Sequence, residues 1–186
     1  MNFNTHSNLK GKHAFLSASK YHWIRYDEDK LAATFYKAMM SARGVALHDF
    51  GHHAITMGIR LAETENTLNM YVNDAIGFRL QSEQTLYYSD NCFGTADAIG
   101  FRDNFLRIHD LKTGETEASF DQLMVYGAIF CLEYRFNPFD IKTELRIYQN
   151  DAIDIVEPDP DDIMHVMDKI VTLDRLIETI KAEESA

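Results

Sequence analysis

The sequence predicts a mixed α/β (α+β) fold in one domain over residues 1–186, with a central mixed sheet flanked by helices. Three observations predict it. Apolar residues recur at helical spacing near both ends of the chain, residues 78–112 lack a long helical stripe, and helical spacing returns at 119–134 before two further strand-like segments. Helices and strands in this order are typical of one sheet with helices packed on it, and a chain of 186 residues favours a single domain.

Three helices are expected in the first part of the chain. Leu31, Phe35 and Met39 recur at fourfold spacing and predict a helix near 28–42. A second helix should run from Gly44 to about Glu63 with its histidines pointing inward, because one helical stripe contains Val45, His48, His52, Ile55 and Ile59. A third helix is expected over 65–77.

Strands are expected next, because the residues from 78 to 112 are rich in Thr, Tyr, Phe and Ile. Polar turns at 89–91 and 102–104 divide the segment into three strands. A helix over 119–134, strands over 141–148 and 152–156, and a long final helix follow. Asp159 and Pro160 begin that last helix, with a capping carboxylate and a proline at the first position.

The turn at Asp103-Asn104 brings two carboxylates together. If these two residues form the whole turn, Asp97 lies directly opposite Asp110, and Lys112 shares their face two residues further on. Two like charges at the end of an apolar stripe are unfavourable unless they are neutralised, and carboxylates suit Mg²⁺ or Mn²⁺. The alternative is a pair of aspartates that face solvent or contact arginines. With Lys112 beside them, the pattern favours a metal site for phosphodiester hydrolysis.

The composition limits how such a protein could bind DNA or RNA. The net charge is −11, whereas proteins that hold nucleic acid by charge alone are basic. Contact with nucleic acid is therefore expected through a small basic patch or through metal ions. No segment is apolar enough for a membrane helix, so we expect a cytoplasmic protein. Cys92 and Cys131 are too few for a four-cysteine metal site.

Four short motifs occur in order along the chain: Gly44-Val-Ala-Leu-His48, Gly94-Thr-Ala-Asp97, Asp110-Leu-Lys112-Thr-Gly114 and Gln122-Leu-Met-Val-Tyr126. Together they resemble the PD-(D/E)XK nuclease superfamily, in particular its RecB-like branch with phage-type exonucleases. The opening Leu16-Ser-Ala-Ser19 with Trp23 is also similar to phage members.

The resemblance implies a restriction-endonuclease-like fold and a Mg²⁺- or Mn²⁺-dependent deoxyribonuclease acting on single- or double-stranded DNA. An exonuclease is expected over an endonuclease, because no recognition domain or basic arm is visible. A role in phage DNA recombination, repair or degradation, in the host cytoplasm, would follow, as a homo-oligomer or with a recombination or replication protein. The implied metal ligands are His48, Asp97, Asp110 and the Leu111 carbonyl; Lys112 is the implied catalytic lysine; Gln122 and Tyr126 are the implied DNA contacts.

Two residues and two other functions stay open. His52 stands where the family often has an acid, and is a second ligand, a spectator or a core residue; Glu83 on the preceding strand is an extra carboxylate or a plain surface residue. The segment from Ala46 to His53, with His48-Asp49 at its centre, also resembles the HD phosphohydrolases, which require an all-helical domain. The other alternative is a non-catalytic accessory protein that keeps a nuclease fold and binds DNA.

Overall fold

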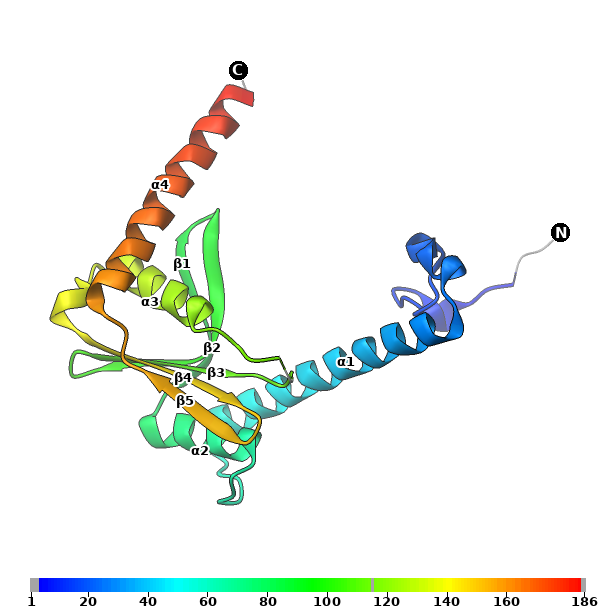
Figure 1. The fold of residues 1–186 in the computed structure, drawn as a ribbon, viewed down its shortest axis with the longest axis horizontal. Helices are drawn as coiled ribbons and strands as arrows, with labels where there is room; N and C mark the ends of the chain where they lie inside the picture. Colours follow the sequence, from blue (N-terminus) through cyan, green and yellow to red (C-terminus); the bar gives the residue numbers. More distant parts are fainter. Residues whose placement is uncertain (1–3, 115, 185–186) are drawn as a thin grey trace. The chain divides into compact units, whose positions relative to one another are not determined.

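A five-stranded sheet in the order β1-β2-β3-β4-β5 lies at the centre of residues 44–184 (Figure 1). Strands β3 and β4 are parallel and the other three pairs are antiparallel, so the sheet is mixed, as predicted. The structure, a computed structural model, describes residues 4–114 and 116–184. Its main elements are α1 (Glu28–Met57), α2 (Thr67–Phe78), β1 (Gln81–Ser89), β2 (Cys92–Arg102), β3 (Phe105–Leu111), α3 (Asp121–Tyr134), β4 (Lys142–Gln149), β5 (Ala152–Val156) and α4 (Pro160–Glu184).

The chain divides into two compact units, Met1–Arg43 and Gly44–Ala186. In the first, the 3₁₀ segments Ser7–Leu9 and Ala18–Arg25 precede the start of α1, and none of residues 4–43 is buried. The second contains the sheet and both hydrophobic cores. The prediction of a single nuclease-like domain over 1–186 stays a prediction.

Helix α1 corrects the prediction of two separate helices. It runs without interruption from Glu28 to Met57, through Gly44, because one glycine costs a helix only about 1 kcal/mol and does not break it. It also ends six residues before the predicted limit at Glu63. Gly58 adopts a left-handed conformation (φ +67°), and the Ile59 amide donates to the Ala54 carbonyl, which closes the helix in a Schellman arrangement.

The turn between β2 and β3 is the predicted two-residue turn. Asp103 and Asn104 both have positive φ (52° and 56°), as a type I′ turn requires. The strands pair in the predicted register, from Arg102–Phe105 to Ala98–His109. Asp97 and Asp110 stand one position beyond the last recorded pair of this ladder.

Helices cover both faces of the sheet (Figure 1). One face packs against α3 and α4 in the α3-side core, and the other against α2 and the end of α1 in the α2-side core. The α3-side core contains Leu86, Ala96, Ile99, Leu106, Ile108, Leu123, Tyr126, Ala128, Ile129, Phe130, Cys131, Ile141, Leu145, Ile147 and Ile163. The α2-side core contains Ala54, Ile55, Tyr71, Val72, Ala75, Leu80, Ala98, Leu111 and Tyr148.

The alternation of side chains along β2 reverses near Asp97. In a regular strand, residues two apart face the same side, yet Ala96 packs in the α3-side core and Ala98 in the α2-side core. The same reversal occurs between Leu80, directly before β1, and Leu86 in β1: they are six residues apart, an even number, yet they lie in different cores. Both strands therefore change face at the level of Asp97.

Candidate metal centre

Three side chains from different elements bring potential metal ligands together. His48 comes from α1, Glu83 from β1 and Asp97 from β2, and one ligand atom of each lies within 4.8 Å of the other two. Nδ1 of His48 is 3.4 Å from Oδ2 of Asp97. His48 and Asp97 are half-buried and Glu83 is exposed, so the cluster is open to solvent on the Glu83 side.

Glu83 has a backbone conformation that is unusual for a strand residue. Its φ is +55°, in the left-handed region, which costs a residue with a side chain roughly 1–2 kcal/mol. Its neighbours Ser82 and Gln84 pair with Ala98 and Ala96, so Glu83 stands opposite Asp97 with no residue inserted. The left-handed residue is where the two strands change face, and its carboxylate joins the other two ligands there.

Asp97 is held by hydrogen bonds to neighbouring strands. The Leu111 amide donates to Oδ2 of Asp97 at 2.9 Å, and the Ser82 hydroxyl donates to the Asp97 carbonyl at 3.0 Å. The Ser82 side chain of β1 therefore fixes the main chain of this residue, and the backbone of β3 fixes its carboxylate. Buried Tyr71 also lies in this electrostatic environment, because burial and the charge of Asp97 both raise the pKa of its hydroxyl.

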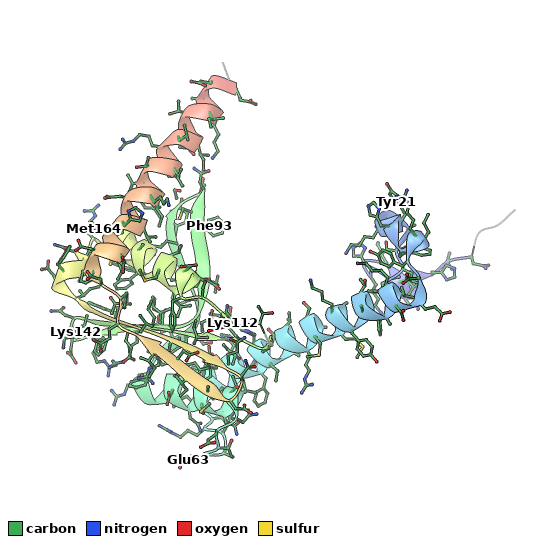
Figure 2. All side chains as sticks on the ribbon, viewed as in Figure 1. Tyr21, Glu63, Phe93, Lys112, Lys142 and Met164 are labelled. Carbon is green, nitrogen blue, oxygen red and sulfur yellow. The ribbon has the colours of Figure 1, made fainter. Side chains whose placement is uncertain are left out.

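Asp110 lies deeper than predicted and is paired with Lys112. Only 3% of Asp110 is exposed, so it lies inside the core, whereas the sequence predicted it at the end of the apolar stripe. Nζ of Lys112 is 2.9 Å from Oδ2 and 3.2 Å from Oδ1 of this carboxylate. Lys112 directly follows the end of β3 (labelled in Figure 2), and its amide donates to the Tyr148 carbonyl of β4.

Gln122 and Tyr126 extend a hydrogen-bonded chain from Lys112 into the core. Lys112 donates to Oε1 of Gln122 at 2.9 Å, Gln122 donates through Nε2 to the Tyr126 hydroxyl at 3.1 Å, and that hydroxyl donates to the Thr95 carbonyl at 2.7 Å. Tyr126 is buried, and both hydrogen bonds of its hydroxyl are made to other residues of the protein. Gln122 and Tyr126 therefore hold the Lys112 ammonium in place through hydrogen bonds. Their predicted contact with DNA stays a prediction.

Two glycines allow close approaches around the site. A Cβ added at Gly44 would lie 2.6 Å from Oγ1 of Thr113, so the missing side chain lets α1 approach the segment after Lys112. A Cβ at Gly94 would lie 3.0 Å from the ring of Tyr126. Both glycines belong to the motifs that carry the resemblance, and both have a steric reason to be glycine here.

The cluster has excess negative charge. The hydrogen bond with Asp97 raises the pKa of His48 above its ordinary value, and the charges of Asp110 and Glu83 contribute to the same shift. Burial and the charge of Asp97 raise the pKa of Asp110, while the Lys112 ammonium opposes that shift. Three carboxylates thus face one ammonium and one imidazole, an arrangement that attracts a cation.

The other residues that the sequence analysis considers for the site are His52, Leu111 and Asp49. His52, one turn after His48, is half-buried and stacks edge to face on His53; its buried Nδ1 has no hydrogen-bond partner among the described residues. It is not part of the three-residue cluster. Leu111 contributes its amide to Asp97, and its carbonyl as a ligand stays a prediction. Asp49, the second residue of the HD-like pair, is exposed and also outside the cluster.

Sequence reasoning missed Tyr71, Ser82, Thr95 and Thr113 as neighbours of the site. Tyr71 lies on the buried face of α2, and nothing in its spacing shows that it lies near Asp97. The polar pattern of β1 offers no signal for the left-handed backbone of Glu83. These contacts depend on how α1 and β1 pack against β2, and local sequence patterns do not show this tertiary packing.

The donors of the cluster fit a divalent cation. One imidazole and two carboxylates are a reasonable set for Mn²⁺, and carboxylates with water suit Mg²⁺.

None of the helices in the described part of the chain has the length and apolarity needed to cross a membrane. In comparisons with family models, curated proteins and solved structures, nothing matches this chain significantly.

Proposed function

We propose that the protein is a metal-dependent deoxyribonuclease with a restriction-endonuclease-like fold, acting from DNA ends. The observation that carries the proposal is the meeting of His48, Glu83 and Asp97 within 4.8 Å beside the Asp110–Lys112 pair. Carboxylates, an imidazole and a lysine in this proximity suit hydrolysis of a phosphodiester, whose transition state gathers negative charge on phosphate oxygens.

His48, Glu83 and Asp97 would hold Mg²⁺ or Mn²⁺, with Asp110 as the buried acid next to them. When bound, such an ion lowers the pKa of a water molecule and offsets phosphate charge. Lys112 places an ammonium next to this position and can donate hydrogen bonds to a phosphate oxygen or orient the attacking water. Gln122 accepts a hydrogen bond from the same ammonium and helps to fix it. The carboxylate of Asp97 is held in place by the Leu111 amide.

The proposal also resolves the conflict between an acidic chain and an anionic substrate. Each divalent cation bound by the cluster cancels two of its negative charges, so the site can accept a phosphate that it would otherwise repel. Lys112 contributes the only positive side chain among the site residues that does not depend on protonation of an imidazole.

The HD phosphohydrolase alternative has less support. It requires an all-helical domain, whereas residues 81–111 form three strands, and Asp49 lies outside the cluster that contains His48. The non-catalytic alternative differs from our proposal only in turnover. A buried acid–lysine pair beside three further ligands is costly to retain in a scaffold, and this favours an enzyme.

The test is a cleavage assay with the full chain on end-labelled linear DNA, single-stranded DNA and closed circular DNA. We expect hydrolysis of linear substrates with Mg²⁺ or Mn²⁺, none of closed circles, and none with EDTA. Asp97→Asn and Lys112→Ala should abolish it. Asp154→Asn and Lys169→Ala, at exposed positions of β5 and α4, are matched controls and should retain it. Lack of cleavage with either metal would support the accessory protein, and loss of activity in Asp49→Ala with retention in Asp97→Asn would support the HD alternative.

A further inference from the structure

The unit Met1–Arg43 contains a groove of about 540 Å³ that is separate from the metal centre in sequence. Its walls come from the segment before α1 and from the first turns of that helix. Aromatic rings dominate the lining and basic side chains join them. The residues that matter here are His13, Phe15, Lys20, Trp23, Tyr26 and Phe35.

The rings of the groove are held but not covered. Nε1 of Trp23 donates to the Ser17 carbonyl at 2.9 Å, which fixes the indole, and Phe15 contacts Phe35 edge to face with centroids 5.0 Å apart. Yet Phe15 is 36% exposed and Phe35 is 46% exposed, and none of residues 4–43 is buried. The groove therefore leaves ring surface available to a flat apolar ligand.

The charge of the chain is divided between the two units. Residues 1–43 contain seven Lys and Arg against three Asp and Glu, a net charge of +4, whereas the remainder contains 11 against 26, a net charge of −15. The whole-chain charge of −11 conceals this division, which is why no basic arm was expected from it. At the groove, Lys20 lines the wall and Nζ of Lys30 lies 6.0 Å from the ring centroid of Tyr26.

We propose that this aromatic groove binds single-stranded DNA, so that the substrate of the nuclease is a single strand or a single-stranded end. Exposed rings stack on bases without regard to sequence, and lysines beside them contact the phosphates, which is the combination that sequence-independent single-strand binding uses. A duplex hides its base faces and offers the rings nothing to stack on. That the bound single strand is DNA rests on the nuclease function proposed above.

Trp23 is the only tryptophan of the chain, so its fluorescence reports on the groove directly. The experiment titrates the full chain, in EDTA, with an oligothymidylate of about 16 nucleotides and with a blunt duplex of the same length. The single strand should quench Trp23 and the duplex should not. Phe35→Leu should weaken binding at least about fivefold, the value of one weak stacking contact. Lys20→Gln should reduce the slope of log affinity against log salt by about 0.7.

Lys169→Ala, at an exposed position of α4, is the matched control and should bind as the unchanged protein does. Circular dichroism checks that Phe35→Leu keeps its helices. The proposal is overturned if the single strand leaves Trp23 emission unchanged, if the duplex binds equally well, or if emission changes only with protein concentration, which would mean that a second copy covers the groove. The titration in EDTA measures binding separately from cleavage. If the single strand does not bind but DNA is cleaved in the assay with metal, this inference alone is contradicted. If the single strand binds but neither metal supports cleavage, the nuclease function alone is contradicted.

Discussion

The Lys112 ammonium lies 2.9 Å from Oδ2 of Asp110, a carboxylate that is almost completely buried. Removing one partner of such a pair leaves the other charge unpaired in the core. We expect Lys112→Met to lower the free energy of unfolding by about 1–3 kcal/mol, as measured by urea denaturation at pH 7. Asp110→Asn in the Lys112→Met background should recover part of that loss. Additive effects of the two substitutions would show that the two side chains are not coupled.

Gln122 should act on catalysis by positioning Lys112. Gln122→Ala removes the acceptor of the Lys112 hydrogen bond, so we expect kcat for DNA hydrolysis to fall by up to about 100-fold with KM little changed. Gln81→Ala, on the exposed edge of β1, is the control. An increase in KM at constant kcat would contradict this role and would favour the direct DNA contact that the resemblance implies.

The approach of α1 to Thr113 should be visible in a double-mutant cycle. Gly44→Ala improves helix propensity by about 1 kcal/mol, but its Cβ would lie 2.6 Å from Oγ1 of Thr113. We expect Gly44→Ala alone to destabilise the protein. In a Thr113→Ala background, where that oxygen is absent, the same change should be neutral or stabilising. Equal effects of Gly44→Ala in both backgrounds, measured by thermal unfolding, would show that the contact does not limit this position.

Buried His109 should make stability depend on pH. Its Nδ1 is 3.1 Å from the Tyr148 hydroxyl, and burial, together with the charges of Arg146 and Arg107, lowers the pKa of the imidazole to about 3. In the unfolded chain His109 has an ordinary pKa near 6.5, so the unfolded state binds a proton that the folded state excludes. The contribution of this residue to the free energy of unfolding is fully present above pH 6.5. It is lost as the pH falls toward 3, with a slope approaching about 1.4 kcal/mol per pH unit.

Urea denaturation at pH 7 and pH 5 measures this effect. The difference between the two free energies of unfolding should shrink in His109→Gln, which cannot titrate, whatever the substitution costs at neutral pH. An unchanged difference would mean that other groups cause the pH dependence.

Local patterns predicted much of the fold. The composition of Asp103-Asn104 determined the turn type and therefore the register of β2 and β3. Likewise, Asp159 caps α4 as expected, since its carboxylate accepts from the Asp161 amide at 3.0 Å. Helix ends were predicted less well. The stripe from Val45 to Ile59 is continuous in spacing, yet α1 ends before Gly58, because a left-handed residue closes the helix there.

The residues of the candidate cluster stand among those that the sequence analysis names, but their geometry was predicted only in part. The hairpin register placed Asp97 near Asp110, but the ladder ends at Ala98, and Asp97 accepts a hydrogen bond from Leu111 while Lys112 pairs with Asp110. The position of Glu83 follows from a left-handed residue in the middle of a strand, which spacing cannot reveal. The meeting of His48 with Asp97 depends on how α1 packs, a tertiary property that no local pattern contains.

Anomalous X-ray diffraction from a crystal of the full chain soaked in Mn²⁺ tests the central claim most directly. We expect one strong anomalous peak within bonding distance of His48, Glu83 and Asp97, and its disappearance in Asp97→Asn crystals soaked in the same way. Absence of a peak at these residues in the unchanged protein, or a peak that persists there in Asp97→Asn, would contradict the claim that this cluster is a metal centre.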